Sequence, residues 1–308
     1  MAKFQIFTDS CSDLPTHIRQ ELGIEYCHMN CVINGEEIQA DLDWKLYSPE
    51  EFYGWMRQGK HMKTTAVPYG EFVKCLTPYL EKGYDCLYIA CSHKCTGSMN
   101  TYNLVREELL EKFPDRRIVG VDSLNASACE GVIVMDAATL QKEGKSLDEV
   151  VEYIEKNRNK YNQFATVDDL TYIKNAGRIK GSKAVLGKIF RKKPIFISDA
   201  IGNNYTLGTV TATKNADKAL LDGIVKRIDK DAPNCRVVIY QAMAQDRAAR
   251  LKEAIKQELN IDADIWWLGP IIGTTCGPGT LAVMCFGKEV TIYEGDGKPT
   301  PLDYSTLG

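Results

Sequence analysis

Short apolar runs alternate with helix-length amphipathic segments along this chain, and this alternation constrains its fold more than any other feature. The apolar runs have the length of strands, as in "KFQIFT" and "YDCLYIAC", and the segments between them carry helical patterns, as in "SLDEVVEYIEKN". A near-continuous apolar run is typical of a parallel strand that is buried on both faces. The alternation therefore predicts an α/β fold in which helices cover a largely parallel sheet.

The length of the chain indicates two domains. A chain of 308 residues exceeds the size that one hydrophobic core usually serves. We expect an N-terminal α/β domain with a largely parallel sheet over residues 1–160 and a second α/β domain over 161–294. Residues 295–308 are rich in glycine and proline and predict a loose tail.

Charge and hydropathy argue against several classes of protein. The net charge is −3, which gives no overall electrostatic reason to bind nucleic acid or a membrane surface. There is no run of about 18 apolar residues that could form a spanning helix. The start of the sequence enters a strand pattern at once and lacks the layout of a signal peptide. We therefore expect a cytoplasmic protein.

The cysteines predict core thiols rather than disulfides. There are 11 of them, scattered and mostly inside apolar runs. Cys27, His28 and Cys31 have a spacing that metal ligands use, but no second Cys or His pair follows at zinc-finger distance. We predict no metal there.

The stretch "CSHKCTGS", from Cys91 to Ser98, allows three interpretations. Ser92 and His93 could form a nucleophile and its base, although neighbours in an extended strand point to opposite faces. Cys91, His93 and Cys95 could bind a metal, although no fourth ligand stands nearby. The third interpretation is a cradle for an anion.

The anion interpretation uses the context of this stretch. An apolar strand ends at Cys91, and a helix is predicted from Ser98 to Lys112. A strand, loop and helix in this order direct free backbone N–H groups and the positive end of the helix to one point. The hydroxyls of Ser92, Thr96 and Ser98 would add neutral donors. The alternative that these hydroxyls only cap the helix stays open.

Similar hydroxyl-rich loops recur elsewhere in the sequence. They occur in "TDSCSD", "KTTAVP", "VDSLNAS" and "GPIIGTTCGPGT". Ligands of open α/β sheets bind at the carboxyl edge of the strands, where such loops gather. No Walker A or G-x-G-x-x-G pattern is present, so we predict no nucleotide cofactor.

A basic segment runs from Lys174 to Lys193 and contains eight Lys or Arg residues without an acidic one. It is either a solvated face or a surface that docks an acidic partner or a phosphate. Arg178 lies in the glycine-flanked "NAGRIKG", so we expect it in a turn where its guanidinium could bind a carboxylate or phosphate.

These segments, taken in order, resemble the DegV family of bacterial lipid-binding proteins. The resemblance extends over nearly the whole chain and is carried by "FTDSCSDLP", "KTTAVPYGEF", "CSHKCTGSMNTY", "VDSLNAS", "YIKNAGRIKG" and "GPIIGTTCGPG". It implies two α/β domains with one long-chain fatty acid between them. It also implies a non-catalytic binding subunit that presents the acyl carboxylate to a separate ATP-using kinase subunit, which forms an acyl phosphate for phospholipid synthesis.

The resemblance also implies roles for particular residues. Thr64, Thr65, Ser92 and Thr275 would bind the carboxylate of a fatty acid of about 16–18 carbons. Thr96, Gly97 and Ser98 would support the cradle, His93 would be an extra head-group ligand, and Arg178 would contact the kinase or a phosphate. We expect no metal, no cofactor, no nucleic acid and only transient membrane contact.

Three departures from the family pattern bear on transfer to a kinase more than on lipid binding. Where the family usually has T-S-Q-P-S, this chain reads T-T-A-V-P from Thr64. His93 and Cys95 replace a serine and a leucine, and Thr275 replaces a histidine. Two rival functions stay open: an acyl-ester or thioester hydrolase that uses Ser92 and His93, and an interaction module built on the basic segment.

Overall fold

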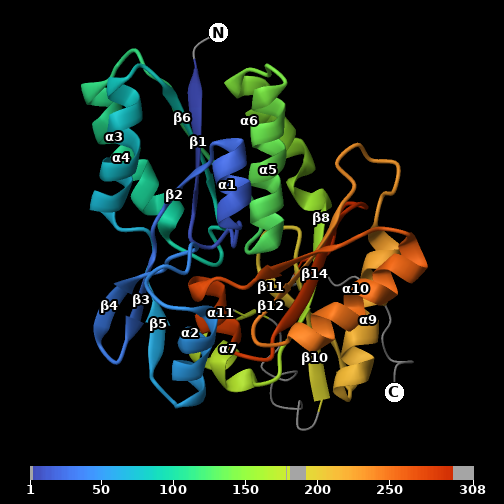
Figure 1. Ribbon diagram of the computed structural model, residues 1–308. Coiled ribbons are helices and arrows are strands. Elements are labelled where there is room, and N and C mark those ends of the chain that lie inside the picture. Colours follow the sequence, from blue (N-terminus) through green and yellow to red (C-terminus); the bar gives the residue numbers. More distant parts are fainter. Residues whose placement is uncertain (1–2, 178, 181–191, 294–308) are drawn as a thin grey trace. The chain divides into compact units, whose positions relative to one another are not determined.

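The computed structural model describes residues 3–177, 179–180 and 192–293 (Figure 1). The chain divides into two compact units. Unit 1 comprises Met1–Ser48, Lys60–Arg158 and Gly269–Ile272, and unit 2 comprises Pro49–Gly59, Asn159–Leu268 and Gly273–Gly308. The domain limits expected from the sequence, 1–160 and 161–294, stay a prediction, and the expected tail 295–308 lies outside the described residues.

Unit 1 contains the parallel sheet that the sequence predicts. Its strand order is β2-β1-β6-β7, and every neighbouring pair is parallel. The strands are β1 (Phe4–Asp9), β2 (Glu25–Cys27), β6 (Asp85–Ala90) and β7 (Ile118–Asp122). All of β6 is buried, as its unbroken apolar run predicts.

Five helices of unit 1 cover this sheet. They are α1 (Thr16–Leu22), α3 (Tyr69–Glu81), α4 (Ser98–Lys112), α5 (Ala128–Lys142) and α6 (Leu147–Asn157). α3 packs on α4, whereas α5 packs on α1 and α6, so two helical layers enclose the sheet (Figure 1). α6 starts with a capping box, in which Ser146 and Glu149 exchange side-chain-to-backbone hydrogen bonds.

A small antiparallel sheet in unit 1 corrects one prediction. The apolar pattern of "IEYCHMNCVI" predicts a single strand, but the segment divides into β2 and β3 (Asn30–Ile33). β3 lies between β4 (Glu36–Gln39) and β5 (Met62–Thr64). The strand breaks because side chains take up the backbone donors between the two parts: His28 N–H donates to Glu71, and Met29 N–H donates to the Ser10 hydroxyl.

Unit 2 is built on a mixed sheet with the order β13-β12-β14-β8-β10-β11-β9. Its strands are β8 (Tyr161–Thr166), β9 (Ile179–Lys180), β10 (Lys192–Ser198), β11 (Asn204–Thr211), β12 (Val237–Gln241), β13 (Asp264–Trp267) and β14 (Leu281–Phe286). Its helices are α2 (Pro49–Arg57), α7 (Leu170–Ala176), α9 (Thr213–Arg227) and α10 (Gln245–Leu259). A short helix, α11 (Pro270–Cys276), follows β13, and a 3-10 turn (Arg158–Lys160) precedes β8. This second sheet-rich unit confirms the predicted fold class.

Two further sequence predictions in this half of the chain are wrong. The β-branched and aromatic residues of "VTIYE" predict a strand, but its described residues, Val290–Tyr293, are not in one. Their backbone bonds go to connecting segments instead: Val290 N–H donates to Asn159, and Ile292 C=O accepts from Ala200. "GPIIGTTCGPGT" was expected to be a loop, but its first half forms α11.

The core of unit 2 requires a glycine on α9. A Cβ added at Gly223 would lie 2.7 Å from the ring of Phe164, which belongs to the buried cluster between the sheet and α9. At Gly208 in β11, a Cβ would meet no atom within 4 Å. Both residues belong to unit 2.

We predict that Gly223→Ala destabilises the protein by about 1–3 kcal/mol, because overpacking outweighs the gain in helix propensity. Gly208→Ala is the matched control and should change the unfolding free energy by less than about 0.5 kcal/mol. Urea titrations followed by circular dichroism measure both. Equal midpoints for the two variants would show that the Phe164 contact does not restrict position 223.

Candidate functional site

The loops after β1, β6 and β7 are hydrogen-bonded to one another at the carboxyl edge of the parallel sheet. Ser92 N–H, after β6, donates to the carbonyl of Asn125, after β7, at 2.8 Å. Ser127 N–H donates to the carbonyl of Cys11, after β1, also at 2.8 Å. The three loops therefore form one connected surface in unit 1, where ligands of open α/β sheets bind.

Ser92 closes the turn that follows β6. Its hydroxyl accepts from Lys94 N–H at 3.2 Å, and its carbonyl accepts from Cys95 and Thr96 at 2.8 and 3.1 Å. The residue is only 1% exposed. The turn thus uses most of the backbone donors that the sequence suggested would be free for an anion.

Thr96 and Ser98 connect this turn to the segment after β5. Their hydroxyls lie 3.0 Å apart, and Ser98 N–H donates to Thr96 Oγ1. Ser98 Oγ also accepts from Val67 N–H at 3.2 Å. These hydroxyls do not occupy the N-cap position of α4, because that residue is Gly97 and it makes no side-chain cap bond. Thr96 nevertheless satisfies the first amide of α4, so capping accounts for its hydroxyl, whereas the Ser98 hydroxyl accepts from Val67.

Three backbone or hydroxyl donors in this part of unit 1 have no acceptor among the described residues. Within residues 3–177, 179–180 and 192–293, the hydroxyl of Thr64 and the backbone N–H groups of Gly97 and Met99 have no hydrogen-bond acceptor. Thr64 ends β5 opposite Cys31 and is partly exposed. Thr65 is less available, because its hydroxyl donates to the carbonyl of Ala66. An uncharged donor set of this kind suits a carboxylate.

His93 points away from Ser92 and pairs with Asp122. Its Nδ1 is hydrogen-bonded to Asp122 Oδ2, and its side chain is 46% exposed, whereas Ser92 is buried. A neutral ring that donates through Nδ1 presents only an acceptor at Nε2, so His93 can donate to an anion only when it is protonated. Among the described residues, no hydrogen bond joins His93 to Ser92. The pair therefore lacks the contact between nucleophile and base that a hydrolase uses.

Three buried carboxyl groups lie behind these loops. Asp9 accepts from Tyr88 Oη at 2.6 Å, and Glu130 accepts from Thr8 Oγ1 at 2.9 Å. The third group, Asp13, is also almost inaccessible to solvent. Sequence reasoning assigned no role to these acids. Glu130 could have been noticed as the one acid in the otherwise apolar stretch from Ala128 to Val134, since an acid is almost never fully buried without a partner.

Burial shifts the ionisation of these carboxyl groups toward the neutral form. It raises the pKa of Asp9, although hydrogen bonds from Tyr88 and the backbone oppose the shift. It raises the pKa of Glu130 well above its usual range, and the nearby Asp9 charge adds to the effect. It also raises the pKa of Asp13 to about 8. A carboxyl group whose pKa is raised carries less negative charge at a given pH, and this reduces its repulsion of an anion at the same edge.

Asp13 joins two distant segments to the β1 loop. Its carboxyl group accepts from the Ser127 hydroxyl at 2.5 Å and from Gly269 N–H at 2.9 Å. Asp13 and Ser127 have φ values of 51° and 56°, which few non-glycine residues adopt. Backbone strain of this kind persists only where the surrounding contacts enforce it.

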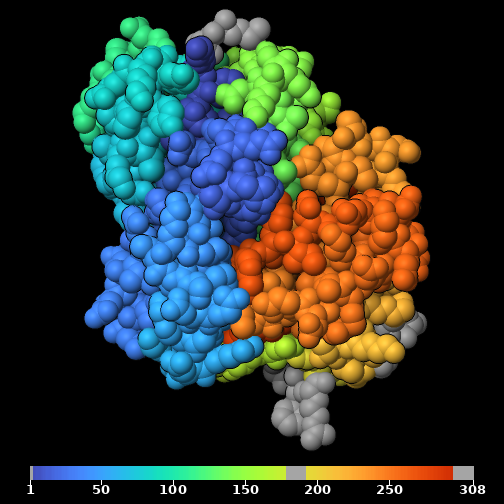
Figure 2. Space-filling view, viewed as in Figure 1, coloured from blue at the N-terminus to red at the C-terminus, as the bar shows by residue number. Residues whose placement is uncertain are grey.

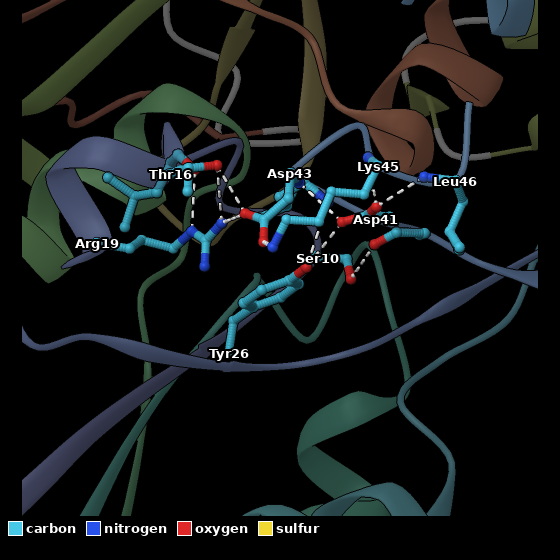
Figure 3. Close-up of polar contacts among 11 residues, drawn as sticks. Ser10, Thr16, Arg19, Tyr26, Asp41, Asp43, Lys45 and Leu46 are labelled. Atoms are coloured by element: carbon cyan, nitrogen blue, oxygen red, sulfur yellow. Dashed lines mark hydrogen bonds and ion pairs between the residues drawn. The ribbon is translucent and has the colours of Figure 1, made fainter. Parts of the chain in front are cut away.

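Other hydroxyls of the β1 loop have structural partners. Ser10 donates to the carbonyl of Ala40 and accepts from Met29, which holds the loop that follows β4. In that loop, Asp41 accepts from the backbone N–H groups of Lys45 and Leu46 (Figure 3). This network fixes the loop and leaves Ser10 no role as a ligand donor.

Figure 3 also shows Asp43 between Thr16 and Arg19 of α1. Burial opposes ionisation of Asp43. Hydrogen bonds from Lys45 and Thr16, together with the charge of Arg19, outweigh burial and lower the pKa of Asp43 to about 2. This side chain is therefore an ionised anchor for the loop, in contrast to the acids behind the sheet edge.

Thr275 lies in unit 2, near the end of α11. The loop after α11 is held rigidly: Gly279 N–H donates to Ala242, and Gly279 C=O accepts from Arg247 at 2.8 Å. Gly277 and Gly279 have φ values of 80° and 87°, and a Cβ at either would meet a side chain within 2.3 Å. The two glycines therefore fix the backbone next to Thr275.

The remaining predictions concern Arg178, metals and membranes. Arg178 lies outside the described residues. In the part of the chain that the structure describes, no group of three His, Cys, Asp or Glu side chains could hold a metal ion. The described helices include none with the length and apolar character needed to cross a membrane.

Comparisons with known proteins give a consistent result. A family model described as an uncharacterised protein of the DegV family matches residues 3–288. A DegV domain-containing protein of Clostridium perfringens (strain 13 / Type A) is 34% identical over 288 residues, which are 93% of this chain and 98% of that protein.

Solved structures agree with these relatives. A structure described as fatty acid binding of a DegV family protein from Thermus thermophilus is 27% identical, with a TM-score of 0.82, and the match covers 93% of this chain and 100% of that one. A stearic-acid-binding protein from Eubacterium ventriosum has a TM-score of 0.84 over 92% of this chain and 98% of its own. At 18% identity, the second match shows the fold alone.

The raised pKa of Asp13 predicts a particular dependence of stability on pH. Because the folded-state pKa of about 8 exceeds the ordinary value of 3.8, the folded protein holds a proton that the unfolded chain releases. Stability should therefore fall as the pH rises from 5 to 8, by at most about 1.4 kcal/mol per pH unit from this group. In Asp13→Asn this component should be absent. Urea titrations at several pH values measure it, and parallel pH profiles for the two proteins would contradict it.

The bond between Val67 and Ser98 gives a second prediction. Ser98→Ala leaves the amide of Val67 without its acceptor, and this should cost about 1–3 kcal/mol. Hydrogen exchange at Val67 should become faster, while protection from exchange in β6 should fall only as far as global stability does. Unchanged exchange at Val67 would mean that Ser98 does not hold this segment.

Proposed function

We propose a function for this chain from the premise that it belongs to the DegV family: it binds one long-chain fatty acid and holds the carboxylate at the hydroxyl cluster of unit 1. The observation that carries the proposal is the hydrogen bond from Val67 N–H to Ser98 Oγ. This bond holds the segment that contains Thr64 against the turn after β6. The description of the Thermus thermophilus relative as fatty acid binding supports the same function.

The head group would be held by neutral donors. We assign the carboxylate to the hydroxyl of Thr64 and the amides of Gly97 and Met99, with Thr65, Ser92 and Thr96 nearby. For Thr275, on α11, the family resemblance implies carboxylate binding as well. Without a positive charge at the cradle, the carboxylate keeps its nucleophilic oxygen accessible, because an ion pair would hold it more tightly.

The acyl chain would supply most of the affinity. Burying about 15 methylenes at about 0.8 kcal/mol each gives an upper bound of about 12 kcal/mol before the entropic costs of binding. The head group would then contribute orientation more than affinity. A chain of about 16–18 carbons is the length we propose.

The finer role we propose is that of a cytoplasmic substrate-binding subunit. The protein would present the carboxylate to a separate ATP-dependent kinase, which would form the acyl phosphate. Arg178 would contact that partner, as the resemblance implies. The raised pKa values of Asp9 and Glu130 support this role, because less negative charge on these buried acids means less repulsion of the carboxylate and of the incoming phosphate.

The direct test is extraction of the purified protein with organic solvent and mass spectrometry of the extract, followed by titration of the delipidated protein with palmitate. We expect a bound fatty acid and saturable binding of one equivalent. Thr64→Val removes the hydroxyl at nearly constant volume and should weaken binding by about 10-fold, the value of one hydrogen bond to a charged group. Recovery of no lipid, together with no binding of palmitate, would refute the proposal.

Thr77→Val is the matched control for this experiment. Thr77 lies on α3 in the same unit, and its buried hydroxyl has no hydrogen-bond partner among the described residues. Its replacement should leave the affinity for palmitate unchanged. If Thr64→Val and Thr77→Val behave alike, the carboxylate is not held at Thr64.

The hydrolase alternative is tested separately with activated esters. Incubation with p-nitrophenyl palmitate and with palmitoyl thioesters should give no turnover above a Ser92→Ala control, because Ser92 makes no hydrogen bond with His93. Multiple turnovers that are lost in Ser92→Ala would replace the binding function with a catalytic one.

A further inference from the structure

Three thiols of unit 1 lie together at the carboxyl edge of the parallel sheet. The eleven cysteines of the chain are all described, and all are thiols. The thiol of Cys91 is hydrogen-bonded to the thiols of both Cys11 and Cys95. Cys11 follows β1, and Cys91 follows the adjacent parallel strand β6. Two segments that are distant in the sequence therefore build one cluster of sulfur atoms.

Backbone contacts hold the three cysteines close to one another. The carboxyl group of Asp9 accepts from Cys11 N–H at 2.8 Å and from Cys91 N–H at 3.3 Å. One short side chain thus bridges the backbones of these two cysteines. The carbonyl of Ser92 accepts from Cys95 N–H at 2.8 Å, which closes a tight turn and returns Cys95 toward the end of β6. The path of the backbone therefore explains why the sulfur atoms meet.

Solvent reaches this cluster at Cys95. Cys95 is partly exposed, whereas Cys91 and Cys11 are 0% and 3% exposed. It lies three positions before α4, which together with α3 forms part of the surface drawn in teal in Figure 2. Hydrogen bonds to the other two thiols, and then burial, raise the pKa of Cys91 well above its ordinary value. An oxidant therefore reacts first at Cys95, because a buried neutral thiol is a poor nucleophile.

We propose that Cys91 and Cys95 form a peroxide-sensitive thiol pair, and that their disulfide weakens fatty-acid binding. The Cys95 sulfur attacks one oxygen of hydrogen peroxide and the O–O bond breaks, which gives a sulfenic acid and one water molecule. The Cys91 sulfur then attacks the sulfenic sulfur and the S–O bond breaks, which gives the disulfide and a second water molecule. The two thiols lose two electrons to the peroxide, and both thiol protons leave in the water.

The disulfide would act on the head-group site through the chain that follows Cys95. An S–S bond of about 2 Å draws the two sulfur atoms closer than a hydrogen bond does. Cys91 is enclosed at the end of the buried strand β6, so the turn that carries Cys95 must move. Gly97, whose amide we assign to the carboxylate, is two residues further on. This effect on binding rests on the proposed function, whereas formation of the disulfide does not.

Peptide mapping of the full chain tests the pairing. Reduced protein is treated with hydrogen peroxide, the remaining thiols are blocked with N-ethylmaleimide, and the protein is digested with trypsin. Trypsin cleaves after Lys94, so the two cysteines fall in separate peptides, residues 83–94 and residues 95–106. We expect the two peptides to be joined, and fragmentation should place the bond at Cys91 rather than Cys86. Absence of the joined peptides, or a bond from Cys91 to Cys11 in their place, would overturn the proposal.

Titration of the delipidated protein with palmitate tests the consequence. Oxidised protein should bind palmitate at least about 3-fold more weakly than reduced protein, because one donor to the carboxylate is misplaced. Dithiothreitol should restore the affinity, which it would not do if methionine oxidation caused the loss. Cys95→Ser should bind palmitate as reduced wild-type protein does, both before and after peroxide treatment. An equal loss of affinity in this variant and in the wild type would overturn the proposed switch.

Cys75→Ser is the matched control. Cys75 lies on α3 in the same unit, is also partly exposed, and is hydrogen-bonded to a buried cysteine, Cys27. This variant should respond to peroxide as the wild type does, and loss of the response would place the switch at Cys75 instead. If reduced wild-type protein binds no palmitate, the proposed function and the effect of the disulfide on it are both refuted. The joined peptides test the thiol pair independently of that result.

Discussion

Buried polar groups at the carboxyl edge of the parallel sheet must find hydrogen-bond partners, and the rest of unit 1 is organised around this requirement. β6 is fully buried, so the loop that follows it cannot leave its backbone unsatisfied. Ser92 meets much of the requirement by accepting from Lys94, Cys95 and Thr96. Hydrogen bonds between the loops satisfy further backbone groups, and they join the loops into one rigid surface.

Rigidity at this edge matters because a ligand head group needs fixed donors. The hydroxyls of Thr96 and Ser98 hold the segment at Val67, and Asp13 holds the backbone at Gly269. The Thr64 hydroxyl and the amides of Gly97 and Met99, to which we assign the head group, are uncharged and have no acceptor among the described residues. Preorganised donors lose little entropy when a ligand binds. Burial raises the pKa values of Asp9 and Glu130, which reduces the negative charge behind this edge.

Much of the fold could be predicted from the sequence, because hydrophobic periodicity determines where strands and helices begin. α4 was predicted from Ser98 to Lys112 and is found there, and β6 follows from an unbroken apolar run. The errors have local causes. The break at His28 depends on the side chains of Glu71 and Ser10, which are far from it in the sequence. The helix at Pro270 is seven residues long and rich in glycine and threonine, so it carries no periodic signal.

Prediction of the site was limited in a different way. The sequence shows which loops carry hydroxyls, and the strand order explains why these loops meet. It does not show which hydroxyls already form hydrogen bonds within the protein. The hydroxyls of Ser10 and Ser92 do, and they hold loops together, whereas the Thr64 hydroxyl has no acceptor among the described residues. Partners that are distant in the chain decide this, as with Thr8 and Glu130, which are separated by 122 positions. Nor do the sequence patterns show that His93 turns toward Asp122.

The central claim is that a fatty-acid carboxylate is bound by neutral donors inside the protein. Carbon-13 NMR of the protein loaded with palmitate labelled at the carboxyl carbon tests it most directly. The account predicts one narrow bound resonance that stays in the ionised position when the solution pH falls below the range in which free fatty acid protonates, and that moves in Thr64→Val. A carboxyl resonance that titrates like free palmitate, or that is insensitive to Thr64→Val, would contradict the account.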